Sequence, residues 1–269
     1  MFLLAKSADV LAGISITALI LIILSAIIGV VFLVADVYSW LLIIRYQKLS
    51  RKISSVSETA EELAQKLLEK EGITDVSVKR CGIFRSIFYG NSYSRRKKAI
   101  FLRKNIYGKN SLTGVATATR LVGLAVQDRD KDKRFLFVSA ALPYVQLAPF
   151  MVLPLVSLGL ILDIFVFSPT VPFLTTLILL CVSLVYVTIA FVYTLLNVKV
   201  NKTAIVVAKD LIVNGDLGLT EEEKTQINKL YKIYLTKYVL DFITSTLELI
   251  KLILQIIYTI LKGLGKIKK

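Results

Sequence analysis

Candidate nucleophiles are present in this chain, but histidine is absent from all 269 residues. Cys81, Ser111 and Cys181 each lack the histidine base that would activate them, and a serine–lysine dyad cannot be assigned from spacing alone. Cys81 falls in a polar segment and Cys181 in an apolar one, so we do not expect them to form a disulfide. There is also no glycine loop of the kind that cradles phosphate. The residue types therefore argue against catalysis.

Asp128, Asp130 and Asp132 form a group of alternating acidic residues. They alternate with arginine and lysine, which oppose a bound cation, and the glycine and terminal glutamate of a calcium loop are missing. We therefore interpret the group as a self-neutralising polar turn that precedes an apolar stretch.

One helical segment, residues 111–127 (SLTGVATATRLVGLAVQ), is part of a longer stretch that matches a known sequence pattern. Seven residues fall without a gap in register with a stretch that runs from Y-D-P through L-R-L-S to V-A-A-H-E-x-G-H-A-x-Q: Tyr93, Leu102, Tyr107, Ser111, Gly123, Ala125 and Gln127. On these residues, and on the order of its apolar and polar segments, the chain resembles the YugP-type membrane zinc metallopeptidases.

The resemblance implies a zinc site whose ligands this chain has lost. In the family motif two histidines one helical turn apart bind zinc, and the glutamate beside the first activates the bound water. The matching positions here are Arg120, Leu121 and Leu124, none of which offers a lone pair to a metal. A third, acidic ligand is expected in a stretch resembling E-F-D-A-S, where this chain has Lys199-Val-Asn201-Lys-Thr203. We therefore expect no metal, no catalytic residue and no cofactor.

Two cations, Arg120 and Lys199, would then lie near the place of the lost zinc. Two buried like charges are costly without an anion, so one hypothesis is that the cavity binds a lipid phosphate, a partner's carboxylate, or this chain's own Asp210 or Asp241. The simpler alternative is that both side chains reach the surface along their apolar stems.

Composition identifies an α-helical integral membrane protein. Hydrophobic residues make up 55% of the chain and the mean hydropathy is +0.69. Three apolar stretches, about 10–34, 135–167 and 171–196, exceed the roughly 20 residues that cross a bilayer. A fourth, about 240–261, carries charges on one face, so it either lies in the membrane interface or lines a polar seam. The first stretch is too long for a cleaved signal peptide and predicts a retained anchor.

Lysine and arginine exceed acidic residues by 15, and most of this excess lies between Arg45 and Arg134. The runs flank apolar stretches and no nucleic-acid module accompanies them, so we expect contact with anionic lipids rather than nucleic acid. The basic run Arg95, Arg96, Lys97 and Lys98 is a candidate anion- or lipid-binding group. The positive-inside rule places the two basic polar segments, 45–134 and 199–238, on the cytoplasmic or matrix side.

The expected architecture has three to four membrane helices and a compact, mainly helical α+β domain, which the resemblance makes zincin-like. The predicted parts are an anchor span (1–44), a degenerate peptidase-like domain in two segments (45–134 and 198–239), a transmembrane hairpin (135–197) joined by the loop FSPTVP, and an amphipathic or transmembrane helix with a basic tail (240–269).

Local signals refine this outline. Ser55 and Glu58 have capping-box spacing before a helix that Gly72 would end, and Thr220 and Glu223 have the same spacing before another. The segments ITDVSVKR and KAIFLRK alternate enough to be strands. Five aromatic residues are either interfacial anchors or, for the tyrosines, helix packing: Trp40, Tyr46, Tyr231, Tyr234 and Tyr238.

The sequence thus predicts a catalytically inactive relative of a membrane zinc peptidase that serves as a structural or accessory subunit of a larger membrane complex. The mitochondrial inner membrane and the bacterial cytoplasmic membrane are both compatible locations, and the basic, histidine-free composition suits an energy-converting membrane. The alternative is a regulator that binds peptides or lipids in the former substrate groove without cutting them.

Overall fold

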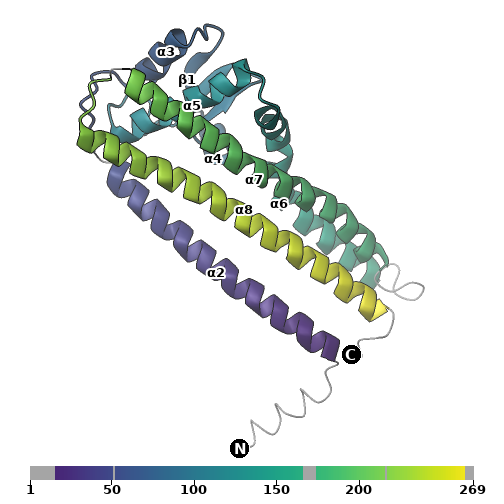
Figure 1. Cartoon of the computed structure of the whole chain (residues 1–269). Helices are drawn as coiled ribbons and strands as arrows, with labels where there is room; N and C mark the ends of the chain where they lie inside the picture. The colour runs from purple at the N-terminus through teal and green to yellow at the C-terminus, as the bar shows by residue number, and fades with distance from the viewer. Residues whose placement is uncertain (1–15, 51, 166–173, 216, 264–269) are drawn as a thin grey trace, which may run out of the picture. The chain divides into compact units, whose positions relative to one another are not determined.

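The structure, a computed structural model, describes residues 16–50, 52–165, 174–215 and 217–263 (Figure 1). The start of the first apolar stretch, the loop FSPTVP and the basic tail lie outside these residues. The described part is mainly helical with one small sheet. Its elements are α2 (Ile16–Ser50), α3 (Ala60–Lys70), β1 (Ser77–Arg80), α4 (Ile83–Phe88), β2 (Ser92–Ser94), β3 (Ala99–Leu102), α5 (Leu112–Arg129), α6 (Lys133–Phe165), α7 (Leu174–Asn214) and α8 (Glu221–Gly263).

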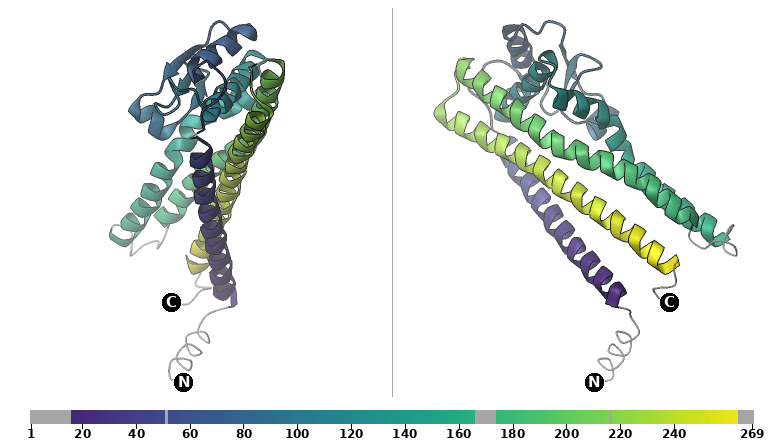
Figure 2. Two further views of the ribbon diagram at one scale, coloured as in Figure 1. Left: turned by 90° about the vertical axis from the view of Figure 1, so that its left-hand side faces the viewer. Right: turned by 45° about the vertical axis from the view of Figure 1, so that its right-hand side comes forward.

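Two of the described helical segments, Ile22–Ser50 and Leu174–Asn214, are long and apolar enough to cross a membrane. Figure 2 shows α2, α7 and α8 as single unbroken helices. The predicted spans at 135–167 and 240–261 are not among the segments that meet this criterion, and they stay predictions. The 41 residues of α7 reach about 60 Å at 1.5 Å per residue, roughly twice the thickness of a bilayer core.

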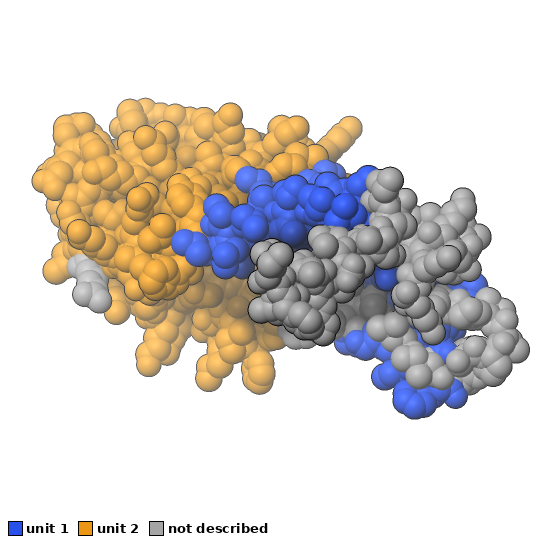
Figure 3. Space-filling model, turned by 90° about the horizontal axis from the view of Figure 1, so that it is seen from below, with its two compact units in different colours: residues 1–37, 147–191, 243–269 blue, residues 38–146, 192–242 orange. Residues whose placement is uncertain are grey.

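The chain divides into two compact units, which Figure 3 shows in different colours. Unit 1 comprises residues 1–37, 147–191 and 243–269, and unit 2 comprises residues 38–146 and 192–242. Unit 2 contains the sheet, α3, α4 and α5. Every candidate site residue from the sequence except Cys181 also lies in unit 2.

In unit 1, the first turn of α7 is capped by an acidic residue of α6. Asp163 accepts hydrogen bonds from the backbone nitrogens of Thr175 at 3.0 Å and Thr176 at 2.7 Å. A carboxylate at a helix N-terminus satisfies orphan N–H groups and complements the helix dipole. Gly159 lies against the backbone of Thr176, where a β-carbon would be 2.9 Å from the threonine Cα.

The core of unit 2 forms around α5. The apolar stripe of α3, with Leu63, Leu67 and Leu68 nearly inaccessible to solvent, packs on α5 as its spacing predicts. The sheet has the order β1-β3-β2, with β1 parallel and β2 antiparallel to β3. Both predicted strands are present, whereas β2 lies in a segment for which the sequence predicted no strand.

The prediction that Ser55 and Glu58 cap the first polar helix is wrong. The helix begins at Ala60, and Glu62 accepts hydrogen bonds from both the backbone nitrogen and the hydroxyl of Thr59 at 2.9 and 2.8 Å. Ser55 instead donates its backbone N–H to Glu223, at the start of α8.

Two other local predictions are confirmed. Gly72 follows α3 in a left-handed conformation, with φ of +70°. The backbone N–H of Thr220 donates to Glu223 at 2.9 Å, and the backbone N–H of Glu223 donates back to the Thr220 hydroxyl at 3.3 Å. From this box α8 continues without a break to Gly263.

Candidate functional site

The candidate site is built on α5, the helix that carries the resemblance to a metal-binding helix. Ser111 is its N-cap and accepts a hydrogen bond from the backbone nitrogen of Gly114 at 3.0 Å. Nearly every residue of α5 is buried, including polar ones such as Thr117 and Thr119. A buried polar side chain has to find partners inside the protein, so the partners of these residues define what the site can do.

Arg120, at the first position of the family's ligand motif, is 5% exposed. Its Nη1 atom donates to Oδ1 of Asn201 on α7 at 2.8 Å and to the hydroxyl of Tyr238 on α8 at 3.0 Å. The guanidinium also lies over the ring of Tyr234, 5.1 Å from its centre. Each of these partners is neutral, and Nε has no hydrogen-bond partner among the described residues. The buried cation is thus held by dipoles and an aromatic face.

The other positions aligned with the family site pack in the core or face solvent. Leu121 is fully buried in the core, and Leu124 packs against it. Lys199 is exposed, and its backbone oxygen accepts from the Thr203 hydroxyl. Within the stretch aligned with the acidic ligand, it is therefore Asn201, and not Lys199, that contacts Arg120.

The sequence leaves two interpretations of Arg120 and Lys199, either a shared cavity that binds an anion or side chains that reach the surface. Lys199 reaches solvent, whereas Arg120 does not. Asp210 is exposed on α7, and Asp241 pairs with Lys237 on α8 at 3.2 Å. The two cations therefore do not share one buried cavity.

A row of hydrogen bonds joins α5 to α8 beside Arg120. The Thr119 hydroxyl donates to the Val115 carbonyl at 2.7 Å and is 2.7 Å from the Tyr231 hydroxyl, which must then donate to it. The hydroxyls of Thr117 and Tyr234 are 3.0 Å apart. The tyrosines are thus used for helix packing, the second of the two uses considered from the sequence.

The spacing of Tyr231, Tyr234 and Tyr238 places all three on one face of α8. Tyr46 on α2 also packs on Tyr234, with ring centres 6.0 Å apart. Trp40, by contrast, is 62% exposed.

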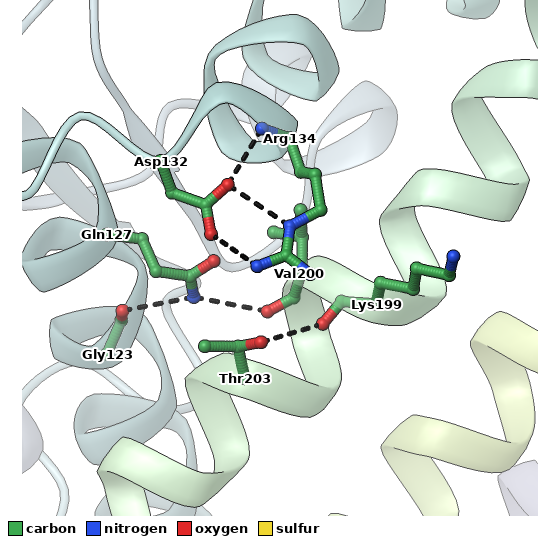
Figure 4. A network of polar contacts seen from close by, with 7 residues as sticks. All are labelled: Gly123, Gln127, Asp132, Arg134, Lys199, Val200 and Thr203. Atoms are coloured by element: carbon green, nitrogen blue, oxygen red, sulfur yellow. Dashed lines mark hydrogen bonds and ion pairs between the residues drawn. The ribbon is translucent and has the colours of Figure 1, made fainter.

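Several residues retained from the family pattern hold α5 against α7 (Figure 4). Gln127 donates through Nε2 to the backbone oxygens of Gly123 at 3.3 Å and of Val200 at 3.1 Å. A β-carbon on Gly123 would be 2.5 Å from the backbone oxygen of Ala204, so only glycine permits this approach. Gly123 and Gln127 thus pack α5 against α7 through groups that bind no metal.

A further retained residue, Tyr93 on β2, donates its hydroxyl to Asp128 at 2.7 Å. Asp128 also pairs with Arg95 at 3.0 Å and Lys98 at 3.1 Å. Burial, together with the bond to Asp128, raises the pKa of Tyr93 above its ordinary value. Half of the predicted basic lipid-binding run thus neutralises this chain's own buried acid, while Arg96 and Lys97 are exposed.

The rest of the acidic group behaves as a self-neutralising turn. Arg129 pairs with Asp130 at 2.9 Å, and Arg134 pairs with Asp132 at 3.1 Å, the latter contact drawn in Figure 4. Although burial opposes it, the bond from Arg134 lowers the pKa of Asp132. Asp128 differs from its neighbours because it is buried and is shared with β2 and the turn that follows it.

The candidate nucleophiles lie apart from this site or have structural roles. Cys81 is buried and its thiol is 3.6 Å from the Gly90 carbonyl, and burial raises its pKa, which disfavours the reactive thiolate. Ser111 is the N-cap of α5. Cys81 and Cys181 are both unpaired.

The residues at the ligand positions do not fit zinc. A guanidinium is a permanent cation without a free lone pair, and leucine has no donor atom. No three histidine, cysteine, aspartate or glutamate side chains come together as a metal-holding group in the part of the chain that the structure describes. Arg120 moreover uses the space at the first ligand position for its contacts with Asn201 and Tyr238.

Comparison with known proteins agrees with the resemblance seen in the sequence. The family model described as "Putative neutral zinc metallopeptidase" matches residues 20–257, which is most of the 269-residue chain. No curated protein and no solved structure matches the chain. By this match the chain, which carries Arg120 and Leu124 where the motif has its two histidines and Leu121 where it has its glutamate, belongs to the neutral zinc metallopeptidase family.

Proposed function

We propose that this protein is a non-catalytic member of its family and serves as a structural or accessory subunit of a larger assembly in an energy-converting membrane. The observation that carries the proposal is the contact of Arg120 with Asn201 and Tyr238. A zinc peptidase needs an ion that polarises the substrate and lowers the pKa of a bound water. A buried guanidinium at the first ligand position repels such an ion.

The retained contacts support a structural role. Gly123, Gln127 and Tyr93 keep the positions that the family pattern gives them, and each makes a packing or hydrogen-bonding contact in unit 2. The helices α2 and α7 are long and apolar enough to place such a domain at a membrane. A protein kept for its surface and its membrane helices has no need of the metal.

The second candidate is a peptide-binding regulator, and the sheet favours it. β1 pairs only with β3 among the described strands, and its residues Lys79 and Arg80 are exposed. An unpaired strand edge binds extended peptide through main-chain hydrogen bonds without any metal. Basic side chains there would favour acidic segments.

The two candidates are separated by purifying the tagged full-length protein from its native membranes in a mild detergent, followed by mass spectrometry. A fixed set of partners in constant stoichiometry is the result expected for the subunit. Variable peptides that no longer co-purify when Lys79 and Arg80 of β1 are both replaced by glutamate would favour the regulator. Metal analysis and peptide hydrolysis assays on the same material test the loss of catalysis, because stoichiometric zinc with activity would contradict both candidates.

A further inference from the structure

A pocket of about 420 Å³ opens at the N-terminus of α5, at the opposite end of that helix from Gln127. Its lining includes Lys52, Lys109, the N-cap Ser111 and Thr113, and no acidic residue among those described. We propose that this pocket binds a phosphate group, supplied by a membrane lipid headgroup or by free phosphate. The proposal does not depend on the proposed function.

Three sources of positive potential converge on the pocket. The N-terminus of the 18-residue helix α5 carries the positive end of its dipole and is a general site for anions. Lys52 and Lys109 are exposed on the lining, and neither forms an ion pair with a described residue. Both ammonium groups are thus available to a ligand.

The second and independent observation is an unused hydroxyl. Thr113 is 1% exposed and lines the pocket, yet its Oγ1 has no hydrogen-bond partner in the described part of the chain. A buried hydroxyl without a partner is costly. A phosphate oxygen in the pocket would accept a hydrogen bond from the Thr113 hydroxyl and remove that cost.

Asn110 distinguishes phosphate from other anions. Its Nδ2 atom donates a hydrogen bond to the Val56 carbonyl. Its Oδ1 atom is buried beside the pocket and has no hydrogen-bond partner among the described residues. The acceptor Oδ1 repels a fully deprotonated anion. It can accept a hydrogen bond from the hydroxyl group of a monoprotonated phosphate or of a lipid headgroup. The pocket should therefore prefer these ligands to sulfate, which carries no proton near neutral pH.

The lining also includes Tyr46 and Ser50, from the last turns of α2. The segment Ile22–Ser50 is long and apolar enough to cross a membrane. Headgroup phosphates lie at the ends of such spans. A lipid headgroup is therefore a source of phosphate within reach of the pocket, alongside free phosphate.

The test uses the full chain in detergent and in nanodiscs. Thermal unfolding is measured while inorganic phosphate or sulfate is titrated, and retained lipid is counted by native mass spectrometry after exposure to phosphatidylglycerol or phosphatidylcholine. Thr113→Val keeps shape and charge and should weaken phosphate binding about tenfold, the size of one charge-assisted hydrogen bond. Lys52→Gln with Lys109→Gln should abolish binding, whereas Lys229→Gln with Lys232→Gln, an equal charge loss on exposed positions of α8, should not.

If inorganic phosphate stabilises the wild type saturably and the pocket variants lose this effect, free phosphate is a ligand of the pocket. Retention of phosphatidylglycerol alone, with the same dependence on Thr113, assigns the lipid. The proposal is overturned if neither ligand is retained, if sulfate is as effective as phosphate, or if the α8 control loses as much binding as the pocket variants. Thr113→Val keeps the test valid if the double lysine variant does not fold, since removing an unpaired hydroxyl should not destabilise the protein.

Discussion

Arg120 on α5 donates a hydrogen bond to Asn201 on α7 at 2.8 Å. In the family pattern the first of these positions carries a histidine, and the second lies in the stretch that supplies the acidic ligand. A residue aligned with a zinc-binding histidine thus donates directly to the stretch aligned with the acidic ligand, as a cation bonded to an amide. A helix-to-helix hydrogen bond now connects α5 and α7 at this point.

This contact should be measurable as a coupling energy. Asn201→Leu leaves the buried guanidinium short of an acceptor, and Arg120→Met leaves the amide oxygen without a donor, so each single change destabilises the protein. The double variant removes both groups, and we expect a coupling of about 1.5–3 kcal/mol, the range for hydrogen bonds to charged groups. Chemical unfolding of the four proteins in detergent measures it. Additive effects would show that the two residues act independently.

Restoring ligand-type residues should restore metal binding. Arg120→His and Leu124→His place imidazoles one helical turn apart, and Asn201→Asp supplies the acid from the residue that contacts position 120. We expect about one zinc per chain in the triple variant and essentially none in the wild type, by elemental analysis. Leu124→His alone is the matched control, because it retains the repelling guanidinium. A zinc-loaded wild type would refute the proposed loss of the site.

The approach of α5 to α7 predicts a large effect for a small substitution. Gly123→Ala would bring a β-carbon within 2.5 Å of a backbone oxygen of Ala204, and a backbone atom cannot swing aside. Overpacking of this kind costs about 1–3 kcal/mol. Gly82→Ala is the control, since nothing lies within 4 Å of its added carbon. Equal unfolding midpoints for the two variants would mean that the helices separate at little cost.

The sequence predicted the local signals well because each depends on neighbours along the chain. The box formed by Thr220 and Glu223 and the left-handed Gly72 need only a few residues to be recognised. The register of Gly123 and Gln127 likewise located the helix that resembles a metal site. What remained open was which distant groups these residues meet.

The extent of α7 and the partner of Ser55 are not predicted from the sequence, because both depend on contacts between distant residues. The sequence bounds the apolar stretch near residue 196 but not the helix that contains it. The helix α7 runs on to Asn214, where Val200, Ala204 and Ala208 form a buried stripe at helical spacing and lysines lie on the exposed side. Hydropathy along the chain averages these two faces, so it does not indicate where the helix ends. The partner of Ser55 lies 168 residues away, where no spacing along the chain indicates it, whereas Glu58 has capping-box spacing nearby.

That long-range contact should make stability sensitive to acid. Although burial raises it, the hydrogen bonds from Ser55 and Thr220 lower the pKa of Glu223 to about 2, from an ordinary 4.5. The contribution is fully present above pH 4.5, and it is lost as the pH falls towards 2, because the unfolded chain takes up the proton first.

Glu223→Gln should therefore be less stable than wild type at neutral pH and should show a smaller loss between these limits. Unfolding midpoints across the acid range measure this dependence. Glu221→Gln, whose side chain is 89% exposed, is the control. An acid slope that is unchanged in Glu223→Gln would contradict the assignment.

The tyrosines between α5 and α8 should make the protein less stable as the pH rises into the alkaline range. Burial raises the pKa of Tyr231 and Tyr234 above their ordinary value of 10.0. Above pH 10 the unfolded chain releases these protons while the folded protein keeps them, so stability falls as the pH rises, by up to about 1.4 kcal/mol per pH unit for each tyrosine.

Below pH 10 this contribution is fully present and does not vary with pH. Tyr231→Phe cannot ionise and should lose part of the alkaline slope, although at neutral pH it costs about 1 kcal/mol for the hydrogen bond to Thr119. Tyr107→Phe, outside this row, should retain the wild-type slope. Unfolding curves across the alkaline range, with tyrosinate absorbance followed in parallel, measure both effects. If Tyr231 ionised in the folded protein at its ordinary pKa, its hydroxyl would not be buried against Thr119.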